Sequence, residues 1–381
     1  MTLVACSSDD GPAAPAVDPA PALKTYAENL HAAYSDSVDD EVAFGKTIDD
    51  FLASPSEASL AAAREGWIAS RAHYMLTEGA RFYGGPIDAE PDNHEAALNS
   101  WPLDEAYIDY TTDKASGTVD ETAGIVNKPD VLKEITPDGL DELNGVAGDE
   151  NVSNGYHAVE FLLWGQALSD VGPGARPYTD FLTSGPRQNA DRRASYLRAA
   201  VSGIVTHLTA VRDAWAPNAP YRTSFESGGM PSVALALSGL AKMSKGELAG
   251  QRINAAYVSK SRRDQHDCFS SLTLEDYERD ARGVQAMYLG EYGGKTGVGF
   301  DTLVRAKDAD LDARIKDQLA KSVQAIAAIP KPFEASVVGA DDSPGRVAIR
   351  AAVASLRAQA DLLAEAASAL GVPIVVPEEN P

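Results

Sequence analysis

Apolar residues recur at helical spacing through most of the chain. Such a spacing places the residues on one face of a helix, which then packs on a core. Gly371 follows the clearest example and is suited to end it. That example, within 345–370, has apolar residues at alternating steps of four and three: Ile349, Val353, Leu356, Ala360, Leu363, Ala367 and Leu370.

The same pattern predicts further helices, and runs that alternate between polar and apolar residues, as strands do, are absent. Ser54, Pro55 and Glu57 suggest one helix start, with serine as the N-cap. Long helices joined by Gly/Pro-rich connections are typical of helical bundles. We therefore predict an all-α fold of two packed helical-bundle domains with a functional pocket at their interface. The other predicted helices lie near 22–53, 56–80, 187–217, 231–258, 273–290 and 310–329.

A chain of 381 residues is long enough for two domains. We predict an N-terminal bundle over 22–185 that carries the HxxE motif, a C-terminal bundle over 186–375, and a tail over 376–381. The boundary near residue 185 follows a Pro/Gly-rich loop and precedes the long helix of 187–217. Residues 1–21 are expected to be a lipobox remnant and a flexible tether.

The first residues carry a candidate address signal. Leu3-Val4-Ala5-Cys6 resembles the lipobox of bacterial lipoproteins, whose cysteine receives lipid. Residues 7–22 are rich in Pro, Ala and Asp and cannot build a core. We therefore expect lipidation at Cys6 and a location in the cell envelope or periplasm; the alternative is a chance tetrapeptide in an unstructured tail.

The net charge of the chain limits the kinds of partner that it is expected to bind. The chain has 33 Lys and Arg against 56 Asp and Glu, a formal net charge of −23. Phosphate backbones require a basic surface, so nucleic acid is not expected as a partner. No apolar run reaches the roughly 18 residues of a membrane span. Membrane contact is therefore expected only through the lipid anchor.

His157 and Glu160 form the central motif. They are spaced i and i+3 in a segment that predicts a helix, so their side chains share a face. An imidazole and a carboxylate one turn apart are a common half of a metal site, and further ligands must come from elsewhere in the fold. The alternative is a capped His–Glu pair at a helix start.

A second helix places charges where other helices place leucine. Trp67, Arg71, Tyr74, Glu78 and Arg81 are spaced 4, 3, 4 and 3. Burying charges is costly unless they are paired. One interpretation is an internal ion-pair network between the bundles. The other is a polar cavity, in which Glu78 is the third metal ligand and the two arginines bind an anion or orient carboxylates.

Asp88 and Asp104 lie just beyond this helix, where helices break. We predict that they belong to the ligand-binding surroundings of the site. Each is also suited to be a helix N-cap.

Residues 155–165 closely resemble the GxHxxE motif of the imelysin-like proteins, peptidase family M75. Four further blocks match this family in order: Trp67 to Asp88, Trp101-Pro102 with Glu105, Gly246 to Arg252, and His266 to Ser270. The resemblance covers about residues 25–370. The last block departs from the family after Ser270, where Ser271-Leu272-Thr273-Leu274 replace an acidic residue and Asn-Thr-His. Gln265 stands where glutamate is usual.

The resemblance implies an all-helical protein of two bundle-like domains with the GxHxxE motif in a pocket between them. It also implies a cell-envelope lipoprotein associated with iron uptake or iron regulation. His266 and Ser270 are then expected to bind ligand or support the metal ligands at the second edge of the pocket.

These observations predict an envelope protein that binds iron, another divalent cation or an iron-bearing ligand at His157, Glu160 and Glu78. Iron is favoured and zinc comes second, because carboxylates suit hard cations and imidazole suits both metals. Haem stays open, and envelope iron-transport components are expected partners. One alternative is an M75-type metallopeptidase, although the chain lacks HExxH and an evident general base. The other is an envelope protein that binds a partner or ligand without metal.

Overall fold

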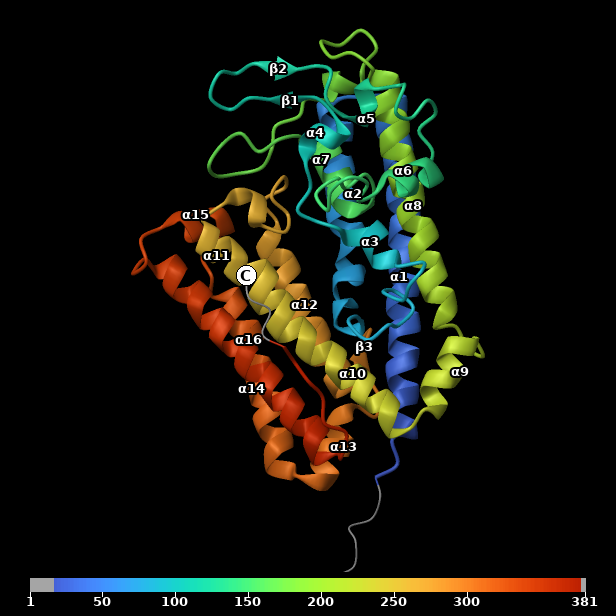
Figure 1. Ribbon diagram of the computed structural model, residues 1–381, viewed down its shortest axis with the longest axis vertical. Coiled ribbons are helices and arrows are strands. Elements are labelled where there is room, and N and C mark those ends of the chain that lie inside the picture. The colour runs from blue at the N-terminus through green and yellow to red at the C-terminus, as the bar shows by residue number, and fades with distance from the viewer. Residues whose placement is uncertain (1–16, 378–381) are drawn as a thin grey trace, which may run out of the picture.

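The computed structural model describes residues 17–377, so the predicted lipidation site, Cys6, lies outside the described residues. Long helices that pack side by side make up most of this part of the chain (Figure 1). The predicted all-α bundle architecture is confirmed.

The N-terminal half is built around α1, which packs along both α2 and α8. Helix α7 lies against α2 and α8, and the short helices α3 and α6 also contact α8. The elements of this half are α1 (Ala20–Ala53), α2 (Glu57–Met75), η1 (Glu78–Ala80), α3 (His94–Asn99), α4 (Glu105–Ile108), α5 (Gly124–Asn127), α6 (Pro137–Leu143), α7 (Gly155–Trp164), η2 (Tyr178–Phe181), α8 (Ala190–Ala214) and α9 (Pro220–Ser227).

The C-terminal half is built around α16, which packs on α10, η3 and α14. Helix α12 lies between this group and the N-terminal half, because it contacts α14 and also α2 and η1. The elements of this half are α10 (Met230–Lys242), η3 (Met243–Asn254), α11 (Ala255–Ser259), η4 (Arg262–Asp264), α12 (Thr273–Leu289), α13 (Phe300–Lys307), α14 (Ala309–Ala327), α15 (Phe333–Val338) and α16 (Pro344–Ala369).

The packing divides the helices at a different place from the predicted boundary near residue 185. Helix α8 runs along α1, and α9 also contacts α1, so both group with the N-terminal helices. The change of partners comes between α9 and α10. The Pro/Gly-rich loop that suggested the earlier boundary connects two helices of one half.

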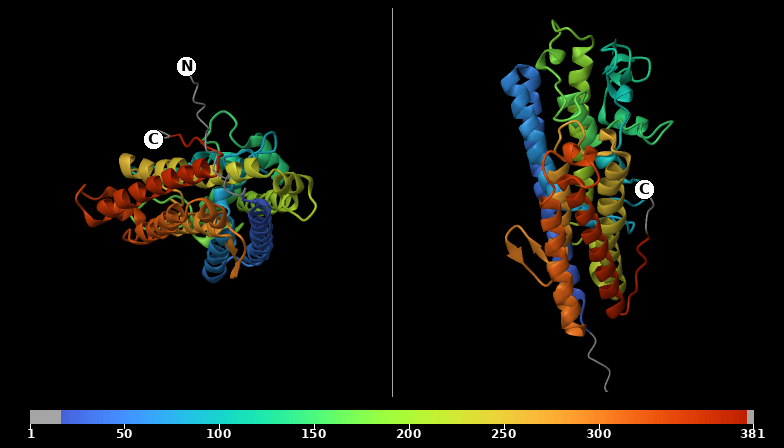
Figure 2. Two further views of the ribbon diagram at one scale, coloured as in Figure 1. Left: turned by 90° about the horizontal axis from the view of Figure 1, so that it is seen from below. Right: turned by 90° about the vertical axis from the view of Figure 1, so that its left-hand side faces the viewer.

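Two short hairpins interrupt the helices. Strand β1 (Thr111–Thr112) pairs with β2 (Val119–Asp120), and β3 (Glu291–Tyr292) pairs with β4 (Lys295–Thr296), both antiparallel. Two-residue strands are too short for an alternating pattern, which explains why the sequence predicted none. Figure 2 shows the β3–β4 hairpin projecting from the side of the helices.

The residues next to the helix ends explain where α16 ends and where α2 begins. Gly371 has a φ of 81° just after α16, as the sequence predicted for a C′ residue. At the start of α2 the N-cap is Ser56 rather than the predicted Ser54. The Ser56 hydroxyl accepts from the backbone N–H of Ser59 at 3.1 Å, and the Ser59 hydroxyl accepts from that of Ser56 at 2.9 Å. This reciprocal pair satisfies two donors that Ser54 would leave open.

Glycines let the two halves approach closely. The segment that contains η1 lies between α10 and α12. A Cβ on Gly283 of α12 would lie 2.3 Å from the carbonyl oxygen of Leu76, and one on Gly239 of α10 would lie 2.6 Å from that of Gly79. A side chain at either position would push the backbones apart, so these glycines fix the depth at which the segment enters the second half.

Candidate functional site

The charged seam that the sequence predicted is split by the end of a helix. Helix α2 ends at Met75, and Glu78 belongs to the 3₁₀ turn η1. Arg71 and Glu78 therefore do not continue one helix face but enter two separate groups of buried charges. We call Arg71, His157, Glu160, His266, Asp267 and Asp276 the imidazole cluster. We call Glu78, Arg81, Glu95, Glu247, Arg252 and Asp280 the arginine cluster.

Both halves of the chain supply the imidazole cluster. His157 comes from α7, and His266 comes from the segment between η4 and α12. The two imidazole rings are edge to face, with centroids 4.6 Å apart. Nη2 of Arg71, on α2, lies 3.4 Å from Nε2 of His157 and 3.3 Å from Nδ1 of His266. The GxHxxE motif therefore lies at the interface of the two halves.

Glu160 connects α7 to the second half. It lies one turn after His157, on the same face, with Oε2 3.2 Å from Nδ1 of His157. Its other oxygen accepts hydrogen bonds from the backbone N–H groups of Phe269 at 3.1 Å and Ser270 at 2.7 Å. These contacts of Glu160 orient the imidazole and hold the 266–270 segment in place.

Two aspartates complete the cluster. Nε of Arg71 donates to Oδ2 of Asp276 at 2.7 Å, and Nδ1 of His266 lies 3.1 Å from the same oxygen. Oδ1 of Asp267 lies 3.6 Å from Nδ1 of His157 and 3.7 Å from Nη2 of Arg71. Asp276 is thereby the main counter-ion of Arg71, whereas Asp267 is held less tightly.

His157, His266 and Asp267 could together hold a metal ion. One ligand atom from each lies within 4.8 Å of the others, and all three side chains are buried. Within residues 17–377, no other group of three or more His, Cys, Asp or Glu side chains meets that distance. It includes His157 from the predicted set, but His266 and Asp267 take the places foreseen for Glu160 and Glu78. The sequence signal for Asp267 was its position in the last family block.

Several polar atoms of the cluster are buried without a hydrogen-bond partner. They are Nε2 of His266, Nη1 of Arg71 and both carboxylate oxygens of Asp267. Oγ of Ser270, whose backbone N–H binds Glu160, also lacks a partner. Buried polar groups are normally hydrogen-bonded, so each such atom requires an explanation. A ligand that these atoms bind would supply one.

Burial sets the protonation of the cluster. Burial and the charge of Arg71 hold the pKa of His157 well below its usual value, and burial and Arg252 lower the pKa of His266 to about 3. Burial raises the pKa of Glu160 to about 7, and burial with the nearby charge of Asp276 raises the pKa of Asp267 well above its ordinary value. Both imidazoles are therefore neutral at neutral pH, as metal ligation requires, whereas Asp267 has to release its proton to bind a metal.

The space beside the two imidazoles is small. A cavity of about 10 Å³ is lined by residues that include Trp101, Glu105, His157, His266 and Phe269. A cavity of this size takes roughly one water molecule. As it stands it holds a single ion or water molecule; a co-ligand beside the ion requires the surrounding side chains to move, and a peptide or a porphyrin requires far more space.

The arginine cluster explains the position of Glu78. Nη1 of Arg81 donates to Glu78 at 2.7 Å, and Arg252 bonds both Glu78 and, at 2.8 Å, Asp280. Burial alone would raise the pKa of Glu78, but Arg81 and Arg252 outweigh it and hold the pKa at about 2. The bond between Arg252 and Glu78 joins the two halves, as in the ion-pair network that the sequence offered as one interpretation of the seam.

Arg252 reaches this cluster from a π-helix. Residues five apart lie above one another in such a helix. Glu247 and Arg252 are five apart in η3, and their side chains form an ion pair of 2.8 Å. The family block at 246–252 thus places an arginine against Glu78.

The remaining predicted site residues have structural contacts. Asp104 is the N-cap of α4 and accepts from the backbone N–H of Ala106 at 3.0 Å. Asp88 closes the loop after η1 by accepting from the backbone N–H groups of Phe82 and Gly85. Arg81 binds Glu78 and Glu95, and the backbone of Ser270 binds Glu160.

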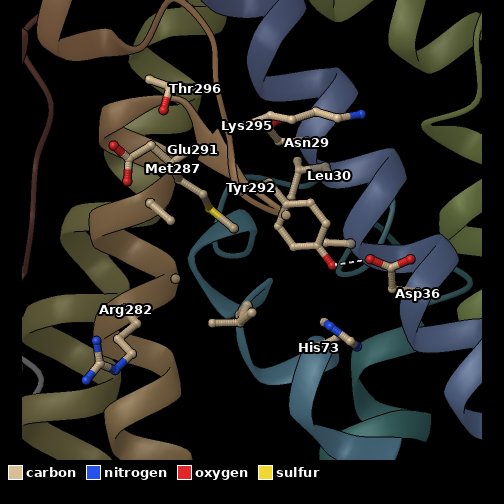
Figure 3. Close-up of a pocket in the computed structure, with 16 residues that line it drawn as sticks. Asn29, Leu30, Asp36, His73, Arg282, Met287, Glu291, Tyr292, Lys295 and Thr296 are labelled. Atoms are coloured by element: carbon tan, nitrogen blue, oxygen red, sulfur yellow. Dashed lines mark hydrogen bonds between the residues drawn. The ribbon is translucent and has the colours of Figure 1, made fainter.

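A separate cavity lies between α1, α12 and the β3–β4 hairpin. Its volume is about 440 Å³, and Leu30 and Met287 are among its apolar lining residues. Figure 3 shows the hydroxyl of Tyr292 pointing at Asp36, to which it donates at 2.7 Å, with His73 nearby. The lining contains no member of the imidazole cluster, so the two sites are distinct.

Among residues 17–377, no helix is both long enough and apolar enough to span a bilayer.

Comparison with known proteins places these features in a family. A family model described as imelysin, peptidase family M75, matches residues 30–363. The iron-regulated protein A of Synechococcus elongatus is 24% identical over 333 residues, which is 84% of this chain and 77% of that protein.

Two solved structures share the fold. A candidate iron-regulated protein A precursor from Parabacteroides distasonis superposes with a TM-score of 0.69 at 18% identity, over 92% of this chain and 94% of that one. An imelysin-like protein from Psychrobacter arcticum superposes with a TM-score of 0.63 at 11% identity, over 93% and 98%. The similarity to both extends over both halves of the chain.

Proposed function

Because the chain belongs to the imelysin family, peptidase family M75, we propose that it binds iron, or a small iron-bearing ligand, at the imidazole cluster. We place this activity in iron uptake or regulation in the cell envelope, with the chain held to a membrane by a lipid on Cys6. Envelope iron-transport components are the proposed partners.

The buried atoms without partners support this proposal most directly. Nε2 of His266 and both oxygens of Asp267 lack hydrogen bonds, and His157 and His266 line a space of about one water molecule. The neutral imidazole of His157 lies 3.6 Å from the same carboxylate. Two imidazoles and a carboxylate suit iron and zinc, and carboxylate oxygen favours the harder ion.

Arg71 determines which form of iron the site can take. Its guanidinium lies within 3.4 Å of both imidazoles and would repel a bare cation between them. Its Nη1 atom has no hydrogen-bond partner. We therefore propose that the cation enters with an anionic co-ligand, which Nη1 binds while His157, His266 and Asp267 bind the metal.

The relative from Synechococcus elongatus is named iron-regulated protein A, which agrees with iron as the ion. Peptide hydrolysis is less favoured, because a peptide does not fit the space beside the imidazoles. Activity on an unfolded protein substrate that a chelator abolishes would support the peptidase instead.

The test is an anaerobic calorimetric titration of the full chain with Fe²⁺, and separately with Zn²⁺, with and without added phosphate as the anion. The informative variants are His266→Ala and Asp267→Asn, with His266→Gln in case the smaller side chain disturbs folding. His31→Ala is the matched control, because His31 is a half-buried imidazole on α1 outside both clusters. Circular dichroism checks that each variant folds.

We expect saturable binding in the wild-type chain and in His31→Ala, and a loss of at least about tenfold in affinity in the cluster variants. Binding that is stronger with phosphate would support the role of Arg71. Failure of the wild-type chain to bind either ion, or equal binding in all variants, would refute a metal site at the imidazole cluster.

A further inference from the structure

Two other histidines face one another on the surface of the N-terminal half, far apart in sequence. His94 is the first residue of α3, and His207 lies on α8. Their Nδ1 atoms are 3.0 Å apart, and their ring centroids are 5.2 Å apart. We propose that this pair is a second divalent transition-metal site, of the class that takes Zn²⁺ or Cu²⁺, and that it is independent of the imidazole cluster.

The distance between the two nitrogens fits a shared metal ion. Zinc lies about 2.0–2.1 Å from imidazole nitrogen, so two such ligands at a tetrahedral angle are separated by about 3.3 Å. The observed 3.0 Å therefore needs an opening of only about 0.3 Å, which is small for two side chains on different elements.

The second nitrogen of His207 is already held in the way that metal-ligating histidines require. Its Nε2 atom lies 3.0 Å from Oδ2 of Asp141, on α6. When Nε2 carries the proton and donates a hydrogen bond to Asp141, the lone pair of the ring is on Nδ1, the atom that faces His94. Carboxylate–histidine–metal arrangements of this kind orient the ring and raise its basicity.

Asp141 is itself fixed, because its other oxygen accepts a hydrogen bond from the side chain of Asn154. Asn154 is the N-cap residue of α7, the helix that carries His157. The proposed site is therefore connected to the start of the helix that carries the GxHxxE motif, while it shares none of the imidazole-cluster side chains.

The pair is accessible from solvent. The His207 side chain is 14% exposed, and His94 is half-buried. Burial and the neighbouring His207 lower the pKa of His94, so its imidazole is neutral at neutral pH. Water molecules can complete the coordination of an ion held by the two histidines.

The test separates this site from the imidazole cluster by working in a His266→Ala background. The full chain is titrated with Zn²⁺ by calorimetry in that background, alone and combined with His94→Ala or His207→Ala. His94→Asn serves as a second variant if alanine disturbs the start of α3. The matched control is His73→Ala, which removes a partly exposed imidazole that is also bonded to an aspartate, Asp40.

We expect one zinc ion to bind in the His266→Ala background and in the His73→Ala control. Loss of His94 or His207 should abolish that binding, and Asp141→Asn should weaken it by about tenfold or more, because the ligands stay but their orientation is lost. Copper provides an independent readout, since the electron paramagnetic resonance spectrum should show two nitrogen ligands that become one in either histidine variant. Absence of zinc binding in the background chain, or a copper spectrum unchanged by both variants, would overturn the proposal.

Discussion

The close contact between α12 and the segment before η1 leads to a prediction with a matched control. A Cβ on Gly283 would lie 2.3 Å from the carbonyl oxygen of Leu76, more than 1 Å short of the 3.4 Å at which ordinary contact begins. Backbone atoms on both sides make the contact stiff. A methyl group at this position must therefore separate the two halves of the molecule locally.

The expected change in the free energy of unfolding for Gly283→Ala follows from two opposing effects. Alanine is a better helix former than glycine by about 0.8–1 kcal/mol. Overpacking of a tight contact typically costs about 1–3 kcal/mol, and rigid backbone on both sides places Gly283→Ala at the upper end. We expect a net loss of about 1–2 kcal/mol in the free energy of unfolding.

Gly203→Ala is the control. Gly203 lies inside α8, and the nearest atom to its added Cβ is Cβ of Pro137 at 3.9 Å, an ordinary contact. The same chemical change should here stabilise the chain by about 0.4–1 kcal/mol. The two substitutions are therefore predicted to have opposite signs.

Urea unfolding followed by far-ultraviolet circular dichroism measures both free energies, with equal slopes against urea as the check that they are comparable. Gly283→Ala should also weaken ligand binding at the imidazole cluster, because Asp276 lies two turns earlier on the same helix. Stabilisation of both variants, or no change for Gly283→Ala, would refute the argument that backbone contact at this glycine holds the halves together.

Further predictions concern the buried charges. Glu78→Gln should lower the free energy of unfolding by about 3–5 kcal/mol, because it leaves Arg81 and Arg252 buried beside a neutral partner. The control is Glu365→Gln, in an exposed ion pair, which should change that free energy by less than about 0.5 kcal/mol. Urea unfolding of both variants compares the two values. The carboxyl of Glu41 is buried, and burial raises its pKa from 4.5 to about 8. The folded chain therefore keeps a proton that the unfolded chain loses, so this group makes stability fall as pH rises from about 4.5 to about 8, by up to about 1.4 kcal/mol per pH unit. Glu41→Gln should flatten that slope and stabilise the chain at pH 8; unfolding curves at pH 4.5 and 8 that shift equally in both proteins would contradict this.

The fold could be predicted from the sequence to a large extent because most of its helices are long and amphipathic. The predicted segment 345–370 agrees with α16 (Pro344–Ala369) to within one residue at each end, and Gly371 marked its end. The two hairpins and the division between the halves were not predictable in this way. Strands of two residues carry no period, and the partner of α8 depends on packing that a single helix pattern does not encode.

The candidate site was less accessible from the sequence. His157 and Glu160 followed from i, i+3 spacing, which needs only local geometry. Glu78 was assigned with them because its spacing from Arg71 continued a helical face, but α2 ends at Met75 and the turn directs Glu78 to Arg252. Asp267 lies in an irregular segment where no spacing rule applies, so its approach to His157 depends on how the two halves meet.

Because both halves supply the imidazole cluster, its composition limits how the family can change in evolution. Arg71 and His157 come from one half, whereas His266, Asp267 and Asp276 come from the other. A recombination event between α9 and α10 would join halves with independent histories, and a mismatch at one position would leave a buried arginine without its aspartate. We expect these residues to be inherited as a unit, so that the two halves diverge together and neither is exchanged as a module.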